Sequence, residues 1–325
     1  MSKRKKITIS IAVMMLLIIT VGLLWWFFPY FHSVSGTDEE TGFNYSITKD
    51  TTVLTKYVGE ETVVYVPDRL KGRKTEVGYQ CFEGTDIEEV YVPDTVEVSI
   101  FAFANCKSLK KFTGSSNKVI SSCMFADDDS LEEVIFINKI EKIELGAFAG
   151  CTSLQEVDFL DEVRYLGSGA FRETGIEQLP EMEKLEHAGN LVFYETPWEE
   201  NQEGDFVIIG TSLQLYSGSE KTVYIPEGVT EVCSAFEYNE ENKRSIQVNE
   251  IYIPDTVKSL NYLAFANQEN VIVYIPDSVT EVVDSDSNKE VKLRGNVKII
   301  TTSGSYAEEY AQKYEIEYEI VEGWD

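Results

Sequence analysis

The sequence predicts an α/β-type repeat solenoid, in which successive turns each add a strand to one parallel sheet on the concave face. The first observation is an apolar phrase that returns every 22 or 23 residues and starts at Ile87, Leu109, Leu131, Leu154 and Ile176. The second is a phenylalanine column at similar steps: Phe82, Phe103, Phe125, Phe148, Phe171 and Phe193. The third is the phrase Val/Ile-x-Val/Ile-Pro, which ends at Pro67, Pro93, Pro226, Pro254 and Pro276. This period lies in the range of leucine-rich repeats, and three columns in register argue against chance.

The repeat array is expected to occupy residues 63–295. Each unit combines a strand, a turn often opened by Pro-Asp, and a return that carries a small residue beside phenylalanine, as in Ala147-Phe148. The small residue lets neighbouring backbones approach, and the ring fills the space behind it. The cadence breaks between Phe193 and Phe236, where alternating residues at 205–209 and 212–216 predict an inserted hairpin at about 201–218.

Both ends of the array are expected to carry covers, because each unit of a solenoid packs mainly on its neighbours. Alternating segments at 43–47 and 52–58 predict an N-terminal capping hairpin within residues 43–62. Residues 296–325 are predicted to form the C-terminal cap, with a short helix at 305–314 and a strand at 316–321.

The N-terminal segment predicts a membrane anchor. Residues 1–6 are basic and are expected in the cytoplasm, whereas residues 7–28 contain no charge. A helix of that length reaches about 33 Å, which is enough to cross the hydrocarbon core. The aromatic run that begins at Trp25 would lie at the exit, followed by a linker at 29–42. A cleaved signal peptide is the competing interpretation, because it shares the basic head and the apolar core.

The charge balance excludes one class of partner. The chain carries 56 acidic and 28 basic side chains, a formal net charge of −28. Such a field repels phosphate backbones, so nucleic-acid binding is not expected. The five cysteines are an odd number and cannot all pair. They are interpreted as small apolar residues that fill a tight interior.

The outward side of the strands supplies the candidate binding face. Side chains alternate across a strand, so Val90 and Val92 in the core place Tyr91 on the open surface. Ten strands in one stack would span about 43 Å. An acidic face edged with tyrosines is suited to recognition, because tyrosine offers contact area with a polar tip. The alternative is that the tyrosines serve only the sheet, by stacking on cross-strand neighbours. The candidate residues are Tyr65, Tyr91, Asp158, Tyr224, Tyr252 and Tyr274, with Glu89, Glu133, Glu156 and Glu250 in the neighbouring column.

No catalytic, cofactor-binding or metal-binding residues are predicted. Asp284-x-Asp286-x-Asn288 begins like a calcium loop, but Lys289 stands where that loop needs glycine. The acidic run at 127–129 is interpreted as a solvated turn. His187 is expected at the surface or half-buried within a repeat, and with His32 and the cysteines it forms no recognisable metal-ligand spacing.

The chain closely resembles the bacterial BspA-like leucine-rich-repeat family of surface proteins. The resemblance rests on Ala-Phe-Ala-Gly-Cys-Thr-Ser-Leu at 147–154, on Val-Tyr-Ile-Pro at 223–226 and 273–276, and on Gly-Ser-Tyr-Ala-Glu-Glu-Tyr-Ala at 304–311. It covers most of residues 43–325. It implies a secreted or surface-attached solenoid used in adhesion or recognition, without catalytic residues. The acidic run at 127–129 departs from the Ala/Gly-Cys element of the family, and the repeat around Phe193 is degenerate.

The expected function is recognition of an extracellular protein by a non-catalytic ectodomain. The chain is expected in the bacterial cell membrane through residues 7–28, as a single-pass protein with the residues after about 30 outside. Two alternatives remain: a polysaccharide-binding surface protein that takes a glycan, and a structural scaffold of the envelope.

Overall fold

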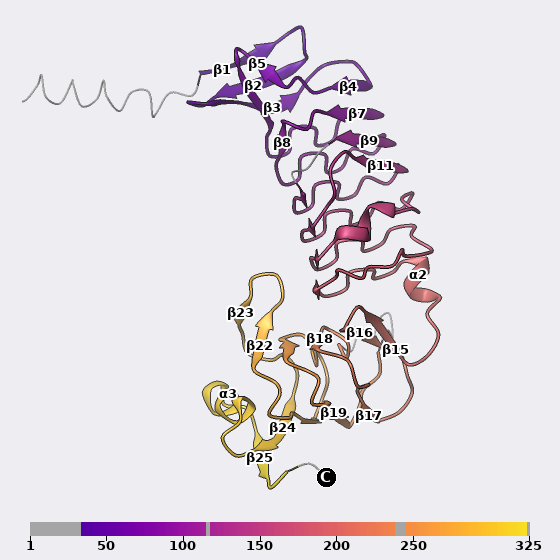
Figure 1. The fold of residues 1–325 in the computed structure, drawn as a ribbon, viewed down its shortest axis with the longest axis vertical. Helices are drawn as coiled ribbons and strands as arrows, with labels where there is room; N and C mark the ends of the chain where they lie inside the picture. The colour runs from indigo at the N-terminus through magenta and orange to yellow at the C-terminus, as the bar shows by residue number, and fades with distance from the viewer. Residues whose placement is uncertain (1–33, 115–117, 238–244, 324–325) are drawn as a thin grey trace, which may run out of the picture.

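The computed structural model describes residues 34–114, 118–237 and 245–323. Figure 1 shows a first arm that descends from an N-terminal sheet and a second arm that turns away from it beyond α2 (Pro197–Glu200). Strands of successive turns pair in parallel along both arms, so the predicted repeat solenoid is confirmed. The predicted cytoplasmic segment and membrane anchor at 1–28 lie outside the described residues.

The N-terminal sheet consists of three antiparallel strands and a parallel continuation. β1 (Val34–Asp38), β2 (Phe43–Ile47) and β3 (Thr51–Tyr57) pair in order, and β3 pairs in parallel with β6 (Arg73–Val77). β5 (Arg69–Leu70) pairs antiparallel with β6. Residues 34–38, expected in a linker at 29–42, instead form β1. Their sequence lacks apolar alternation, and backbone pairing to the open edge of β2 determines their conformation.

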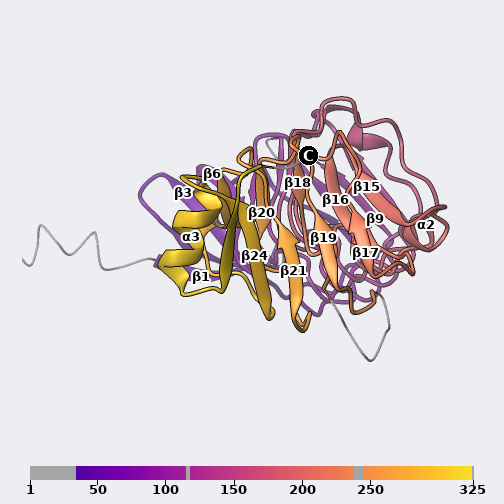
Figure 2. The same cartoon turned by 90° about the horizontal axis from the view of Figure 1, so that it is seen from below.

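One row of strands carries the apolar phrase that defines the repeat. It comprises β4 (Val63–Tyr65), β7 (Glu89–Val92), β9 (Lys111–Gly114) and β11 (Glu133–Phe136) in the first arm, and β17 (Thr222–Tyr224), β19 (Glu250–Tyr252), β21 (Val271–Tyr274) and β24 (Val297–Thr302) in the second. Figure 2 shows the second set side by side across its arm. Between the sets, the 3₁₀-helix η1 (Asp158–Glu162) replaces a strand. The single sheet that the sequence predicts is therefore interrupted and forms two sheets.

A second row of short strands lies along the other side of the solenoid. It comprises β6, β8 (Glu97–Val98), β10 (Val119–Ile120), β12 (Lys142–Ile143), β13 (Tyr165–Leu166), β14 (His187–Ala188), β16 (Ser212–Tyr216), β18 (Glu231–Val232), β20 (Ser259–Asn261) and β22 (Glu281–Asp284). β15 (Phe206–Ile209) and β23 (Lys289–Glu290) add antiparallel hairpins to β16 and β22. In Figure 1 this second row lies on the inner side of the bend. The row of the apolar phrase, expected on the concave face, faces outward from the bend.

The phenylalanine column forms a continuous stack inside the first arm. Phe148 is fully buried, and its ring lies 5.2 Å from those of Phe125 and Phe171. Phe171 and Phe193 continue the stack at 5.3 Å. The second arm has its own core, built around Phe236 and separate from the first. The predicted role of the column is therefore confirmed.

A second column of buried residues stands three positions after the phenylalanines in the sequence. Cys106 and Cys151 occupy it, and their thiols donate to carbonyls of an earlier turn, Phe82 and Phe125, at 3.0 and 3.1 Å. Asp128 occupies the same column and is fully buried, so the interpretation of the whole run at 127–129 as a solvated turn is wrong. The position is set by the repeat register, which turns this side chain inward despite its charge. Four of the five cysteines are buried, as predicted.

Asp128 is expected to make the protein less stable as the pH rises. The Cys106 N–H donates to Asp128 Oδ1 at 2.7 Å, but Oδ2 is buried and lacks a hydrogen-bond partner in the described part of the chain. Burial raises the pKa of this carboxyl well above its ordinary value. The folded state then binds the proton more tightly, so the contribution of Asp128 to stability falls as the pH rises through its raised pKa.

We predict that Asp128→Asn stabilises the protein at pH 7 by about 1–3 kcal/mol, because the amide cannot ionise and so avoids the cost of a buried carboxylate. The amide keeps an acceptor for Cys106 and carries no charge. Urea unfolding at pH 7 and at about pH 4 provides the measurement. The advantage of the variant should shrink at the lower pH, where the parent carboxyl is protonated. An advantage that does not change with pH would contradict this assignment.

Each turn of the first arm places two residues in the left-handed region. They stand two positions before and two after the buried phenylalanine, and glycine occupies both at Gly146 and Gly150. The turn around Phe193 uses Leu191 and Glu195 instead, with φ of 55° and 56°. Non-glycine residues are strained there because Cβ approaches the carbonyl oxygen.

We predict that Glu195→Gly raises the free energy of unfolding by about 0.5–1 kcal/mol, because relief of the strain exceeds the entropic cost of glycine. Glu195 is exposed, so little packing is lost. Urea unfolding measures the change, and Glu183→Gly, at an exposed residue outside the left-handed region, serves as control. Destabilisation by both substitutions would contradict the prediction.

The C-terminal end is closed by α3 (Tyr306–Tyr314) and β25 (Tyr318–Val321). Ser305 precedes the helix, and its Oγ accepts from the Glu308 N–H at 3.1 Å, which satisfies one of the free amides of the first turn. β24, expected within the cap at 296–325, pairs in parallel with β21 and therefore continues the array. The covering element begins at Ser305.

Candidate binding surface

The first part of the candidate face is a tyrosine pair on β4 and β7. The inward side chains Val64 and Val90 are buried, which places Tyr65 and Tyr91 on the opposite side of the strands. The two rings are stacked, with centroids 4.7 Å apart and an interplanar angle of 9°. The Tyr91 hydroxyl donates to Glu89 at 2.7 Å, and this carboxylate raises the pKa of Tyr91. Tyr65 is 70% exposed at the free end.

The second part is a stack of three tyrosines on β17, β19 and β21. The rings of Tyr224 and Tyr252 lie 4.5 Å apart, and those of Tyr252 and Tyr274 lie 4.1 Å apart. Tyr224 closes the stack and is 65% exposed. Hydrogen bonding with Tyr274, together with burial and Glu250, raises the pKa of Tyr252 above its ordinary range. The Tyr252 phenol is therefore neutral at physiological pH.

The middle of the expected face does not carry a column of stacked tyrosines. Glu133 lies on β11 and forms an ion pair with Lys111 at 2.6 Å. Glu156 and Asp158 are exposed, but Asp158 begins η1 and does not lie on a strand. The structure therefore brings the candidate residues together as two tyrosine stacks, with an acidic interruption between them.

Basic side chains of the first arm are largely neutralised by the next turn. The pairs join residues 22 or 23 positions apart, which is one repeat. Because both members share one column, the repeat itself brings opposite charges together. This leaves the excess of carboxylates to define the surface potential. The pairs are Lys107–Asp129, Lys110–Glu88, Lys118–Glu141, Lys139–Asp161, Arg164–Glu186 and Lys184–Glu162.

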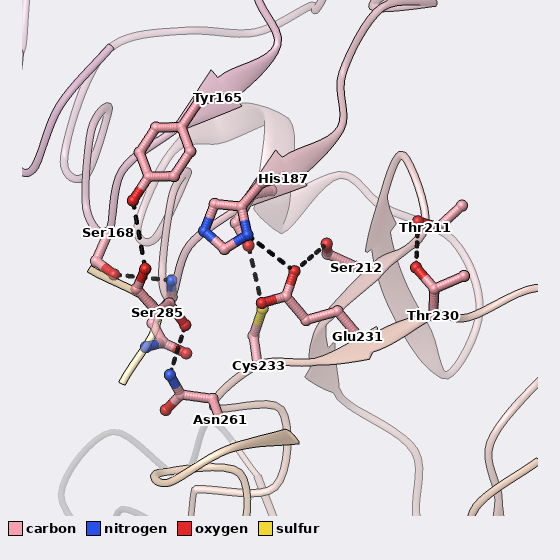
Figure 3. A network of polar contacts seen from close by, with 12 residues as sticks. Tyr165, Ser168, His187, Thr211, Ser212, Thr230, Glu231, Cys233, Asn261 and Ser285 are labelled. Carbon is pink, nitrogen blue, oxygen red and sulfur yellow. Dashed lines mark hydrogen bonds and ion pairs between the residues drawn. The ribbon is translucent and has the colours of Figure 1, made fainter. Parts of the chain in front are cut away.

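Figure 3 shows a polar network at the bend. The sequence did not predict this network. His187 Nδ1 lies 3.2 Å from Glu231 Oε2, which also accepts from the Ser212 hydroxyl at 3.0 Å. The His187 ring stacks on Tyr165 at 4.6 Å. The Cys233 thiol donates to the Ala188 carbonyl at 3.2 Å. These contacts hold β14 of the first arm against β18 of the second.

The loop after β22 completes this junction. Ser168 N–H donates to Asp286 Oδ1 at 3.1 Å, and the Tyr165 hydroxyl donates to the Ser285 carbonyl at 3.4 Å. Burial, with Asp286 and Glu231 nearby, raises the pKa of Tyr165 to about 12. The acidic segment that begins like a calcium loop thus supplies a contact between the arms. The break in cadence after Phe193 was the only sequence signal for this region, and it does not identify the pairing.

Two other kinds of site are absent from the part of the chain that the structure describes. In residues 34–114, 118–237 and 245–323, no three His, Cys, Asp or Glu side chains are placed to hold a metal ion. Over the same ranges, no helix has the length and apolarity needed to span a membrane. The predicted anchor at 7–28 lies outside these ranges.

Solved structures similar to this chain are bacterial leucine-rich-repeat proteins. A leucine rich cell surface protein from Faecalibacterium prausnitzii is 18% identical, with 90% of this chain and 96% of that chain covered and a TM-score of 0.45. The pneumococcal vaccine antigen PcpA is 12% identical, with coverage of 90% and 99% and a TM-score of 0.38. The leucine-rich-repeat protein of T. pallidum is 16% identical, with coverage of 89% and 100% and a TM-score of 0.35.

A comparison with curated proteins found no match. The BspA type leucine rich repeat region, in contrast, matches this chain in six copies over residues 75–198 and 208–306. These residues make up more than half of the chain and contain the phenylalanine column, Tyr91 and the stack of Tyr224, Tyr252 and Tyr274. The protein therefore belongs to the BspA-type leucine-rich-repeat family.

Proposed function

We propose that this protein is a non-catalytic recognition protein that binds an extracellular protein through its two tyrosine stacks. Membership of the family indicates a protein-binding or adhesion role. The observation that carries the proposal is the pair of stacks, Tyr65 with Tyr91 and Tyr224 with Tyr252 and Tyr274, each of which ends in a largely exposed ring. Stacked tyrosines form a rigid surface, so little side-chain entropy is lost when a partner binds.

The proposed location is the outer side of a bacterial cell membrane, with residues 7–28 as the anchor. The uncharged run and the basic residues that precede it support this orientation. Protease treatment of intact cells tests the proposal: the repeats should be digested while a fragment with residues 1–28 stays with the membrane. Protection of the repeats in intact cells would contradict it.

We predict that replacing Tyr224, Tyr252 and Tyr274 together by serine weakens partner binding at least tenfold without loss of fold. The substitutions remove the exposed aromatic area but leave the buried residues Val223, Ile251 and Val273 in place. The full-length protein in detergent is screened against extracellular proteins and glycans, and each hit is measured again with the variant. Tyr79→Ser, at an exposed tyrosine of the first arm, is the control.

The outcomes of the screen separate the candidate functions. A protein partner whose binding is lost in the triple variant supports the proposal. Binding that persists after protease treatment of the target identifies a glycan and overturns it. Full binding by a folded triple variant excludes the stack of Tyr224, Tyr252 and Tyr274 from the recognition face and contradicts the proposal. Co-purification only with membrane proteins of the same cell favours the envelope scaffold.

A further inference from the structure

The interruption of the outer row leaves one strand with an open edge. β11 pairs in parallel with β9, but the turn that follows forms η1 instead of the next strand. Leu160 within η1 is fully buried. The helical turn thus fills the core with a side chain that a strand in the same place would not have directed inward. The chain therefore leaves β11 without a paired strand on its second side, where Phe159 of the next turn packs against Phe136 with ring centroids 5.0 Å apart.

The backbone amides on this side of β11 have no backbone partner among the residues that the structure describes. The Glu133 N–H donates to Lys110 O at 3.0 Å, and the Ile137 N–H donates to Gly114 O at 2.9 Å. Alternate residues of a parallel strand bond to opposite neighbours, so Val134 and Phe136 direct their amides to the open side. Among the described residues, no backbone group bonds to these two amides.

The same edge exposes apolar side chains that other strands bury. Val90 and Phe112 at inward positions of β7 and β9 are completely buried, whereas Val134 at the equivalent position of β11 is half-buried. Phe136, in register with Gly114, is half-buried as well. On the outward side, Ile135 is 41% exposed. The absence of a paired strand thus leaves apolar surface exposed, as well as hydrogen-bonding groups.

A cavity of about 500 Å³ lies along this edge. It is bounded on one side by β11 and on the other by Glu156, Asp158 and Phe159. Glu133 is neutralised by Lys111, but Glu156 and Asp158 form no ion pair within the described chain. The cavity therefore combines an open strand edge, half-buried apolar groups and two uncompensated carboxylates.

We infer that the open edge of β11 binds an extended, basic segment of another protein as an added parallel or antiparallel strand. Backbone hydrogen bonds to Val134 and Phe136 would supply affinity, as in other cases of strand addition. Apolar side chains of the segment would cover Val134 and Phe136, and alternate basic side chains would meet Glu156 and Asp158. A second copy of this chain fits poorly, because it would bring like charges together across the edge. The inference rests on the proposed protein-binding function and specifies one class of partner.

The test uses a labelled probe, acetyl-Lys-Val-Lys-Val-Lys-Val-amide, with the full-length protein at low salt. We expect saturable binding, measured by fluorescence polarisation. Glu156→Gln combined with Asp158→Asn should weaken it about tenfold, because two facing charges are lost. Glu60→Gln combined with Glu61→Gln removes the same charge from exposed positions elsewhere and should leave the affinity unchanged. Equal weakening by both variants would show attraction to the net charge alone and would overturn the inference.

Two further measurements test strand addition itself. Probes N-methylated on all valines or on all lysines lose the amides of one edge each, so only one of them should lose binding at least tenfold. Binding should also slow hydrogen exchange at the Val134 and Phe136 amides, but not at Ile135, whose position in the register directs its amide to β9. Equal effects of the two methylations, or unchanged exchange at both amides, would contradict an added strand. Self-association of the protein through β11 would contradict the choice of occupant.

The probe experiment tests the added strand, and the tyrosine experiment tests the proposed function. Either can fail without the other. The probe should bind the triple tyrosine variant as tightly as the parent, because β11 lies in the other arm. Loss of partner binding in the tyrosine variant, together with no binding of the probe, would overturn the added strand and leave the proposed function in place.

Discussion

Replacing Phe148 by alanine is expected to lower the free energy of unfolding by about 3–5 kcal/mol, the usual range for a buried phenylalanine. The ring is fully buried and lies parallel to that of Phe171, with an interplanar angle of 3°. Its removal opens a cavity in the middle of a stack that extends on both sides. Neighbouring turns cannot collapse into the space, because their strands are held in register.

Urea unfolding of the full-length protein measures this loss. Tyr65→Ala removes a ring of similar size from an exposed stack and should cost under about 1 kcal/mol. A loss below about 1 kcal/mol for Phe148→Ala would show that the column does not carry the stability of the first arm. The core of the second arm is separate, so slow-exchanging amides around Phe236 should keep most of their protection.

Deletion of residues 305–325 is expected to cause aggregation and to destabilise the second arm. α3 buries Ala307, Tyr310 and Ala311 against the last turn, and β25 covers the edge of β24. The Tyr310 hydroxyl accepts from the Leu293 N–H at 2.7 Å and donates to the Val291 carbonyl at 2.6 Å. Without these residues, the last turn exposes apolar surface and an unpaired strand edge, which promotes association.

Size-exclusion chromatography and thermal melting compare the truncated protein with the parent. Tyr310→Phe is the matched variant, because it keeps the ring and loses only the two hydrogen bonds. It should elute at the volume of the parent with a loss of about 1–3 kcal/mol, the cost of leaving buried backbone groups unpaired. A truncated protein that remains soluble with unchanged melting would show that the segment is not a cover.

Several features could be predicted because they depend on local pattern. The side-chain alternation that buries Val90 also exposes Tyr91, so the two outward tyrosine columns follow from the strand period alone. The repeat period likewise places Phe148 between Phe125 and Phe171. In both cases the contacts join residues on one strand or on adjacent turns, and a period specifies such contacts directly.

Asp128 and Asp158 show where the local pattern was insufficient. Both are aspartates in acidic surroundings, yet Asp128 is fully buried and Asp158 begins a helical turn in place of a strand. The charge of a residue predicts exposure only when the register leaves it free to turn outward. At Asp128 the stacked neighbours fix its direction, and after β11 the packing of Leu160 competes with strand formation.

The sequence by itself determined the repeat, its buried column, the two covers and the composition of the outward face. The tertiary structure alone decided the bend, the contact of Ser168 with Asp286, and the open edge of β11. The reason is the range of the interactions. A period encodes contacts between adjacent turns, whereas the bend depends on pairing between residues about 45 to 120 positions apart, for which the repeat carries no signal.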